Sequence, residues 1–214
     1  MGKLNDSLLS GSTGRTGRLV VANVAGTEIL RARPKKRTSA PSPKQVLIQE
    51  RMKQCYNFIL PYKEFASFYF GTKNGMNSCY TQAFANLLKA HKLDYANDKI
   101  IPVYSEIQFA RGGLMAAVPT GLSSQAAGQI TLEWFNNAAG DPERDADELQ
   151  LLYLAEDEQI PIFMENLAQR ADTSVTITVP PNLQGKKLRV WIAFRAQDMI
   201  RVSISTYVGE VNVQ

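Results

Sequence analysis

The sequence predicts an α+β protein with an N-terminal extended arm, a helical middle unit and a C-terminal antiparallel β-sandwich. Three observations support this. Residues 2–17 are rich in Gly, Ser and Thr, apolar residues recur at helical spacing over 42–92, and from about Pro102 short β-type runs alternate with turn signals. We therefore divide the chain into an arm with a β-hairpin and linker (1–41), a helical unit (42–101) and a β-sandwich domain (102–214).

The N-terminal segment has little of its own to pack. Glycines at 11, 14 and 17 give its backbone freedom, so residues 2–17 are expected to form an extended arm. The same Gly-rich run lacks the Lys and the flanking strand and helix of a phosphate-binding loop. Short β-type runs at 18–24 and 28–33 flank a Gly-centred turn and predict a hairpin. The basic, Pro-rich stretch 34–43 predicts an extended linker.

Two helices are predicted in the middle unit. The first has a complete start signal, because Ser42 is a good N-cap, Pro43 suits the first helical position and Gln45 completes a capping box. Its buried face is expected to carry Ile48, Met52, Cys55 and Ile59. The second helix is predicted over 76–91, with Tyr80, Phe84, Leu87, Leu88 and His91 at helical spacing. Since Cys55 and Cys79 lie in these helical stretches, we expect two reduced thiols.

The predicted β-sandwich rests on six β-type runs separated by turn signals, at 103–109, 129–135, 148–155, 174–179, 187–195 and 199–208. This spacing is typical of a sandwich of the immunoglobulin or fibronectin type. The Cys-Trp-Cys pattern of true immunoglobulin domains is absent, so only the architecture is predicted.

Several short motifs occur together in a fixed order. They are Gly14-x-x-Gly17, Gly26 followed by Ile29-x-Arg31-x-Arg33-Pro34, a helix start with Pro41, Gln45 and Arg51, and a final Ser205-Thr-Tyr-Val-Gly209. In this order they resemble an uncharacterised domain family common in Bacteroidota, with a Gly-rich start, an Arg-Pro step, a helical middle and a Ser-x-Tyr-x-Gly strand. The Arg-Pro step and the helix after it are also similar to small phage and mobile-element proteins. The resemblance implies a fold and no chemistry.

Charge is unevenly distributed along the chain. Residues 1–55 carry eleven Lys or Arg against three acidic residues, while the remainder is net negative. A basic arm on an acidic body favours an electrostatic partner, either nucleic acid or a neighbouring copy. The candidate contact residues in the arm and linker are Arg15, Arg18, Arg31, Arg33, Lys35, Lys36 and Arg37.

A second candidate interface lies in the last two runs. Alternation places Leu188, Val190, Ile192 and Phe194 inward, together with Ile200, Val202 and Ile204. If the runs pair as a hairpin, the outer face carries Trp191, Tyr207, Arg189, Arg195 and Arg201, residue types that are enriched in interface hot spots. The alternative is that the helical unit covers this face.

The sequence favours no enzyme activity, cofactor, metal or small-molecule substrate. His91 is the only histidine, and no nucleophile motif surrounds it, so a structural position at a helix end is favoured over a general base. Zinc needs about four Cys or His ligands. The acidic stretch 141–148 offers carboxylates to calcium, but its spacing departs from an EF-hand and a solvated loop is favoured. No apolar run is long enough to span a membrane and no secretory signal is evident, so we expect cytoplasmic synthesis.

These features favour a structural subunit of a self-assembling particle, such as a tube, a filament or a phage-like virion, which would place the chain in a released particle. In this hypothesis the arm and the aromatic face make the contacts of a homo-oligomer. A nucleic-acid-binding protein that uses the basic arm is the alternative, although no recognition helix or RNA-binding aromatic motif is present. A surface or adhesion module is a third hypothesis, which fits the sandwich but lacks an export signal.

Overall fold

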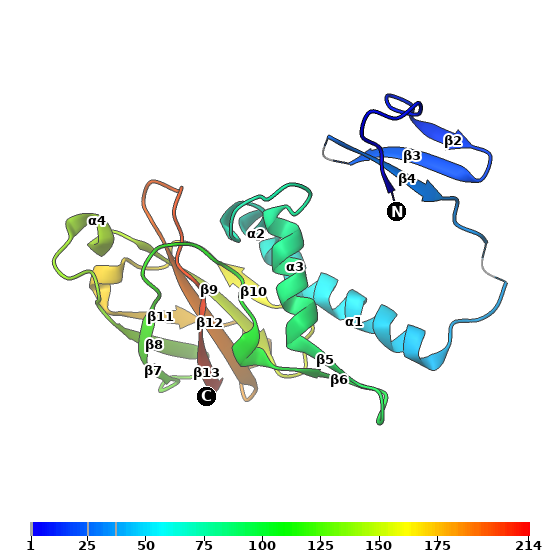
Figure 1. The fold of residues 1–214 in the computed structure, drawn as a ribbon. Helices are drawn as coiled ribbons and strands as arrows, with labels where there is room; N and C mark the ends of the chain where they lie inside the picture. Colours follow the sequence, from blue (N-terminus) through cyan, green and yellow to red (C-terminus); the bar gives the residue numbers. More distant parts are fainter. Residues whose placement is uncertain (1, 25, 37) are drawn as a thin grey trace.

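The computed structural model describes residues 2–24, 26–36 and 38–214. Along the chain it forms a small N-terminal sheet, a helical unit and two facing antiparallel sheets (Figure 1). The mixture of helices and antiparallel sheets is the coarse architecture that the sequence predicts. Two residues of the sequence-based predictions, Ala25 in the hairpin turn and Arg37 in the linker, lie outside the described residues.

The N-terminal sheet has four short strands in the order β1-β4-β3-β2. Their bounds are β1 (Gly2–Lys3), β2 (Gly14–Thr16), β3 (Leu19–Val24) and β4 (Thr27–Ala32). The predicted hairpin is confirmed, because β3 pairs with β4. The predicted extended arm over residues 2–17 is wrong. Strands β1 and β2 pair with the outer edges of this hairpin, where unpaired backbone groups are available. A two-residue turn with Gly17 at φ 58° connects β2 to β3.

The helical unit begins where the sequence predicts. Helix α1 (Pro43–Ile59) follows Ser42, whose backbone N–H donates to Gln45 Oε1 at 3.1 Å. A 3₁₀ turn η1 (Leu60–Tyr62) leads into α2 (Lys63–Tyr69), and α3 (Cys79–Ala90) starts after the N-cap Ser78. Strand β5 (His91–Asp94) then pairs with β6 (Lys99–Pro102), a hairpin that the sequence did not predict.

The predicted buried face of α1 is correct only in its second half. Cys55 and Ile59 are fully buried, whereas Ile48 and Met52 are 38% and 43% exposed. The reason is that the first half of α1 projects from the side of the helical unit, where Leu47 is its one buried residue among those described (Figure 1). The helix therefore presents apolar side chains that the described chain covers only in part.

The C-terminal part consists of two antiparallel sheets that face each other. One sheet has the order β11-β8-β7 and the other the order β10-β9-β12-β13. The bounds are β7 (Val118–Ser123), β8 (Gln129–Phe135), β9 (Glu148–Ala155), β10 (Ile162–Met164), β11 (Ser174–Thr178), β12 (Lys187–Arg195) and β13 (Thr206–Asn212). Side chains from both sheets share one core, including Ile130, Leu132, Trp134, Leu151, Val190, Ile192 and Phe194.

Two predicted strands are wrong in detail. Residues 103–109 contain a 3₁₀ turn, η2 (Tyr104–Glu106), rather than a strand. The predicted run 199–208 becomes regular only at Thr206, so Ile200 and Ile204 are exposed while Val202 is buried as expected. Two serines explain the irregularity: Ser203 Oγ accepts from Phe194 N–H at 2.9 Å, and Ser205 Oγ accepts from Phe109 N–H at 3.0 Å. The two buried hydroxyl groups here accept the hydrogen bonds that backbone carbonyl groups accept in a regular sheet.

The sheet β10-β9-β12-β13 is covered on both faces. Alternate residues of β9 and β12 point into the sandwich core, as Tyr153 and Ile192 do. The residues between them, such as Leu152 and Trp191, belong to a second core shared with α1, α2 and α3. The protein thus stacks a helical layer, a four-stranded sheet and a three-stranded sheet.

We predict that Ile192→Asp unfolds the sandwich. Ile192 is fully buried between the two sheets, and an unpaired carboxylate there has no partner. The expected loss is more than about 4 kcal/mol, measured by urea unfolding, whereas the control Ile192→Val should lose only about 1 kcal/mol. A soluble Ile192→Asp variant with an unchanged unfolding midpoint would show that the register of β12 is wrong.

We predict two free thiols of unequal reactivity. Cys55 and Cys79 are both unbonded, and burial raises the pKa of the Cys55 thiol to about 11. In the native protein at neutral pH, Cys55 should therefore react far more slowly with iodoacetamide than the half-buried Cys79. Mass spectrometry of Cys55→Ser and Cys79→Ser variants separates the two rates. Fewer than two free thiols in the unfolded, non-reduced chain would contradict the prediction.

Candidate interaction surfaces

One face of the N-terminal sheet is basic. Directly paired residues of antiparallel strands lie on the same face. Arg15 pairs with Val20, and Val20 pairs with Arg31, so both arginines lie on one face. Lys3 pairs with Ile29, which is two residues from Arg31 and shares that face. We name the set Lys3, Arg15 and Arg31 the basic face.

The opposite face is largely apolar. It carries Leu19, Val21 and Leu30, which pair across β3 and β4 away from the basic face. Its acidic residue, Glu28, is held by the loop that joins β1 to β2, because Ser10 Oγ and Gly11 N–H both donate to its carboxylate, at 3.0 and 2.8 Å. That loop presents Leu8 and Leu9 to solvent. We name Leu8, Leu9 and Leu19 the apolar side of this sheet.

More basic side chains lie at the end of the sheet where the linker leaves it. Arg33 N–H donates to the Arg18 carbonyl at 2.7 Å, which brings the β2–β3 turn beside the start of the linker. A shallow hollow of about 500 Å³ is lined there by Arg18, Arg33, Lys35 and Lys36. These residues and the basic face are all exposed, and within the described residues none of their side chains has an ion-pair partner.

The predicted aromatic interface is overturned by burial. Trp191 is fully buried, and its indole N–H donates to the Tyr104 carbonyl at 3.0 Å. The ring lies 5.9 Å from that of Phe58 on α1 and 5.3 Å from that of Tyr207 on β13. The helical unit covers this face, which is the alternative left open by the sequence. Trp191 and Tyr207 therefore join the layers of one chain.

The three arginines of that face also have partners within the chain. Arg189 pairs with Glu210 at 3.0 Å and stacks over the Tyr104 ring. Arg195 is buried and pairs with Glu148 and Glu165 at 3.0 and 3.1 Å. Arg201 is exposed, with a 3.0 Å ion pair to Asp198. Of the five residues, only Arg201 is exposed, while Arg189 and Tyr207 are half-buried and Trp191 and Arg195 are buried.

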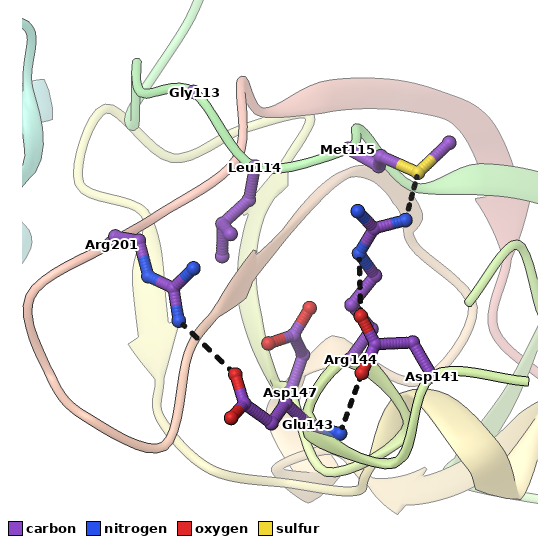
Figure 2. Close-up of a pocket in the computed structure, with 8 residues that line it drawn as sticks. All are labelled: Gly113, Leu114, Met115, Asp141, Glu143, Arg144, Asp147 and Arg201. Carbon is purple, nitrogen blue, oxygen red and sulfur yellow. Dashed lines mark hydrogen bonds and ion pairs between the residues drawn. The ribbon is translucent and has the colours of Figure 1, made fainter.

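The loops at one end of the sandwich surround a hollow of about 300 Å³, shown in Figure 2. Its charged groups face one another across the opening. Arg144 binds Asp141 at 3.2 Å, and Arg201 lies 4.0 Å from Glu143. Beneath them, Arg170 and Asp147 form a fully buried ion pair of 2.9 Å. Burial raises the pKa of the Asp147 carboxyl, and the Arg170 guanidinium opposes that shift.

This arrangement argues against a calcium site in the acidic stretch. Each carboxylate there has a partner: Arg144 for Asp141, Arg201 for Glu143, Asn136 for Asp145, Arg170 for Asp147 and Arg195 for Glu148. A cation would have to displace these groups. No cluster of three or more His, Cys, Asp or Glu that could hold a metal ion is found in the described ranges.

His91 has the features of a structural histidine. It is buried at the end of α3, and its Nδ1 lies 2.8 Å from the Leu87 carbonyl oxygen. Burial lowers the pKa of the imidazole, so the ring is neutral at pH 7. Its neighbours include the Phe58 ring rather than a nucleophile.

Two exposed apolar surfaces were not predicted. One runs along α1 at i, i+4 spacing and consists of Ile48, Met52, Tyr56 and Leu60. We name it the α1 stripe. The other brings Phe68 of α2 beside the turn that carries Met199 and Ile200, since Tyr69 O–H donates to the Met199 carbonyl at 2.7 Å. The sequence showed that these four positions, spaced i, i+4, are all apolar. It did not show that this side of the helix would be exposed.

Comparisons with known proteins give a family and weak structural similarity. A family model described as a family of unknown function (DUF6266) matches residues 11–209. A search of curated proteins finds no match. The fibronectin domain of human collagen alpha-1(XX) is 14% identical, with 47% of this chain and 87% of that chain covered and a TM-score of 0.37. The corresponding domain of human contactin 1 is 11% identical over 48% and 82% of the chains, with a TM-score of 0.33.

We predict that Trp191→Ala lowers stability and leaves the mass in solution unchanged. Truncating a buried indole between two layers should cost about 3–5 kcal/mol, measured by urea unfolding. Phe135→Ala is the matched control, because Phe135 is 60% exposed on β8 and its removal should cost less than about 1 kcal/mol. A stable Trp191→Ala variant with a smaller assembled mass would restore the interface interpretation.

Proposed function

Because the chain belongs to a family of unknown function (DUF6266), we propose a function from its structure: it is a structural subunit that self-assembles, with the N-terminal sheet of one copy docked on the next. The single observation that carries this proposal is the isolation of that sheet from its own body. The recorded hydrogen bonds of residues 2–24 and 26–36 stay within that segment. Figure 1 shows the sheet standing apart, at the far end of the extended linker.

A sheet of this size does not have enough core to be stable alone. Val21 and Ile29 are its only buried apolar residues among those described. Small sheets gain stability when they pack against another element, and no element within residues 38–214 packs against this sheet. Contact with a neighbouring copy would supply the missing burial. The same contact, repeated on every copy, would generate a closed ring or an open filament.

The two surfaces that best fit such a contact are apolar. One is the apolar side of the N-terminal sheet, and the other is the α1 stripe, which leads directly from the linker. Exposed apolar groups of this kind mark interaction sites when they are grouped rather than scattered. Ten residues, 33–42, separate the sheet from α1, so a copy can present both surfaces together. We propose a tube, filament or phage-like particle as the product.

We also infer that the C-terminal part has the architecture of an immunoglobulin- or fibronectin-type sandwich. Its two facing antiparallel sheets, of three and four strands, and its loops gathered at one end are the support for this assignment. In this proposal the sandwich is a rigid support and performs no catalysis. The buried, neutral His91 and the paired carboxylates of the loop end favour that interpretation.

We predict that deleting residues 1–40 abolishes assembly and leaves a folded monomer. The truncated chain keeps both cores, so its thermal unfolding should match that of the full chain. Mass in solution and electron microscopy measure the assembly. Leu8→Ser with Leu9→Ser should weaken it in the full chain, while the control Lys35→Ala with Lys36→Ala should not. Particles of unchanged size after the deletion would exclude the sheet as the connector, and an unfolded product would place it in the core.

A further inference from the structure

We propose that the N-terminal sheet binds nucleic acid through its basic face and the adjoining basic hollow. The proposal rests on the juxtaposition of Lys3, Arg15 and Arg31 on one face of the sheet with Arg18, Arg33, Lys35 and Lys36 around the hollow at its end. It is independent of self-assembly, for which the apolar side of the sheet and the α1 stripe are the candidate contacts.

The first step of the argument is that the positive charge is uncompensated. Residues 2–36 contain two acidic residues, Asp6 and Glu28, against these seven basic ones. Glu28 lies on the opposite face and is engaged by Ser10 and Gly11. All seven basic side chains are exposed, and none has an ion pair in the part of the chain that is described. Concentrated like charge destabilises a small sheet by self-repulsion, and a polyanionic ligand would relieve that repulsion.

The second step concerns the spacing of the groups. Arg15 and Arg31 are separated by one intervening strand, which at about 4.8 Å per strand places their Cα atoms about 10 Å apart. Val20 lies between them on the same face and is half-buried. The residue between the two guanidinium groups is therefore apolar, and no carboxylate at that position competes with a phosphate for them. Several phosphates of one backbone lie within reach of such a row. Arginine suits this task because its planar group binds phosphate in a bidentate manner.

The third step decides between nucleic acid and the acidic body of a second copy. The body carries more acidic than basic residues, but most of its carboxylates already have a basic partner. The paired ones are Glu106, Asp141, Glu143, Asp147, Glu148, Glu156, Asp157, Glu165, Asp198 and Glu210. The seven described carboxylates of the body (56–214) without an ion pair are spread over α2, the β5–β6 hairpin, β8, α4, the loop after β9 and η3, so they do not form one acidic face opposite the basic one. A phosphate backbone offers one charge per nucleotide.

The geometry also sets the kind of binding. The exposed basic groups come from a sheet, and the face carries no exposed aromatic side chain on which a base could stack. Contacts of this type go to phosphates and carry little sequence information. We therefore expect binding that is weakly sequence-selective and strongly dependent on salt.

The test uses the full chain and a fluorescent DNA duplex, with fluorescence anisotropy measured between ~50 and ~200 mM salt. We expect the logarithm of the binding constant to fall with the logarithm of salt with a slope of about −6 if all seven basic side chains contact phosphates, because each contact contributes about −0.9. Arg15→Ala with Arg31→Ala should reduce the steepness by about 2. Arg15→Lys with Arg31→Lys should retain most of the steepness of the salt dependence, because the charge is kept.

Lys53→Ala with Lys89→Ala is the matched control, since both residues are exposed on the helical unit and the change in net charge is the same. This control should bind like the original chain. Equal weakening by the control and the arginine variant would overturn the proposal, as would the absence of binding at low salt. Salt-sensitive self-association that needs Arg15 and Arg31 but no DNA would instead assign the basic face to an acidic surface of a second copy. Assembly mass, measured in parallel, separates failure of this proposal from failure of the assembly proposal.

Discussion

The structure depends on a four-stranded sheet that is covered on both faces. Strand β9 and strand β12 form its centre, and their side chains divide between the sandwich core and the helical core. Trp191 is the largest side chain on the helical side and contacts rings from α1 and β13. Burying the second face commits the helical unit to the sandwich, and it removes the aromatic surface from contact with other molecules. The surfaces that remain for partners are those at the margins of this stack.

At the loop end of the sandwich, a buried ion pair fixes the loops to the four-stranded sheet. Arg170 is buried there with its guanidinium 4.0 Å from the Phe194 ring and two donors on the Asp147 carboxylate, at 2.9 and 3.2 Å. It also donates to the Met115 carbonyl. One side chain thus links the connections before β7, β9 and β11 to strand β12. Breaking such a pair leaves a buried charge and costs about 3–5 kcal/mol, so this end of the sandwich is a rigid structural joint.

Local signals in the sequence predicted local structure well. The capping box at Ser42 and the β3–β4 hairpin depend on neighbouring residues alone, and both are present. The orientation of Trp191 depends on a third layer, which alternation in one strand cannot reveal. A signal was nevertheless there: residues 149–155 and 190–194 are nearly continuous apolar runs, as expected for strands buried on both faces. The exposed row of α1 was missed for a related reason, because the sequence did not show that only half the helix meets the body.

The basic face of the N-terminal sheet illustrates a different limit. The sequence identified its residues as basic and exposed, but their grouping depends on strand register, and a shift of one residue moves every side chain to the other face. The two-residue turn at Gly17 sets that register, since it pairs Thr16 with Leu19 and therefore Arg15 with Val20. The β3–β4 pairing then places Arg31 on the same row and Glu28 on the opposite face. A segment that composition alone describes as a flexible arm becomes, through two turns, a sheet with one charged and one apolar side. Such a sheet can contact a neighbouring copy and a phosphate backbone at the same time.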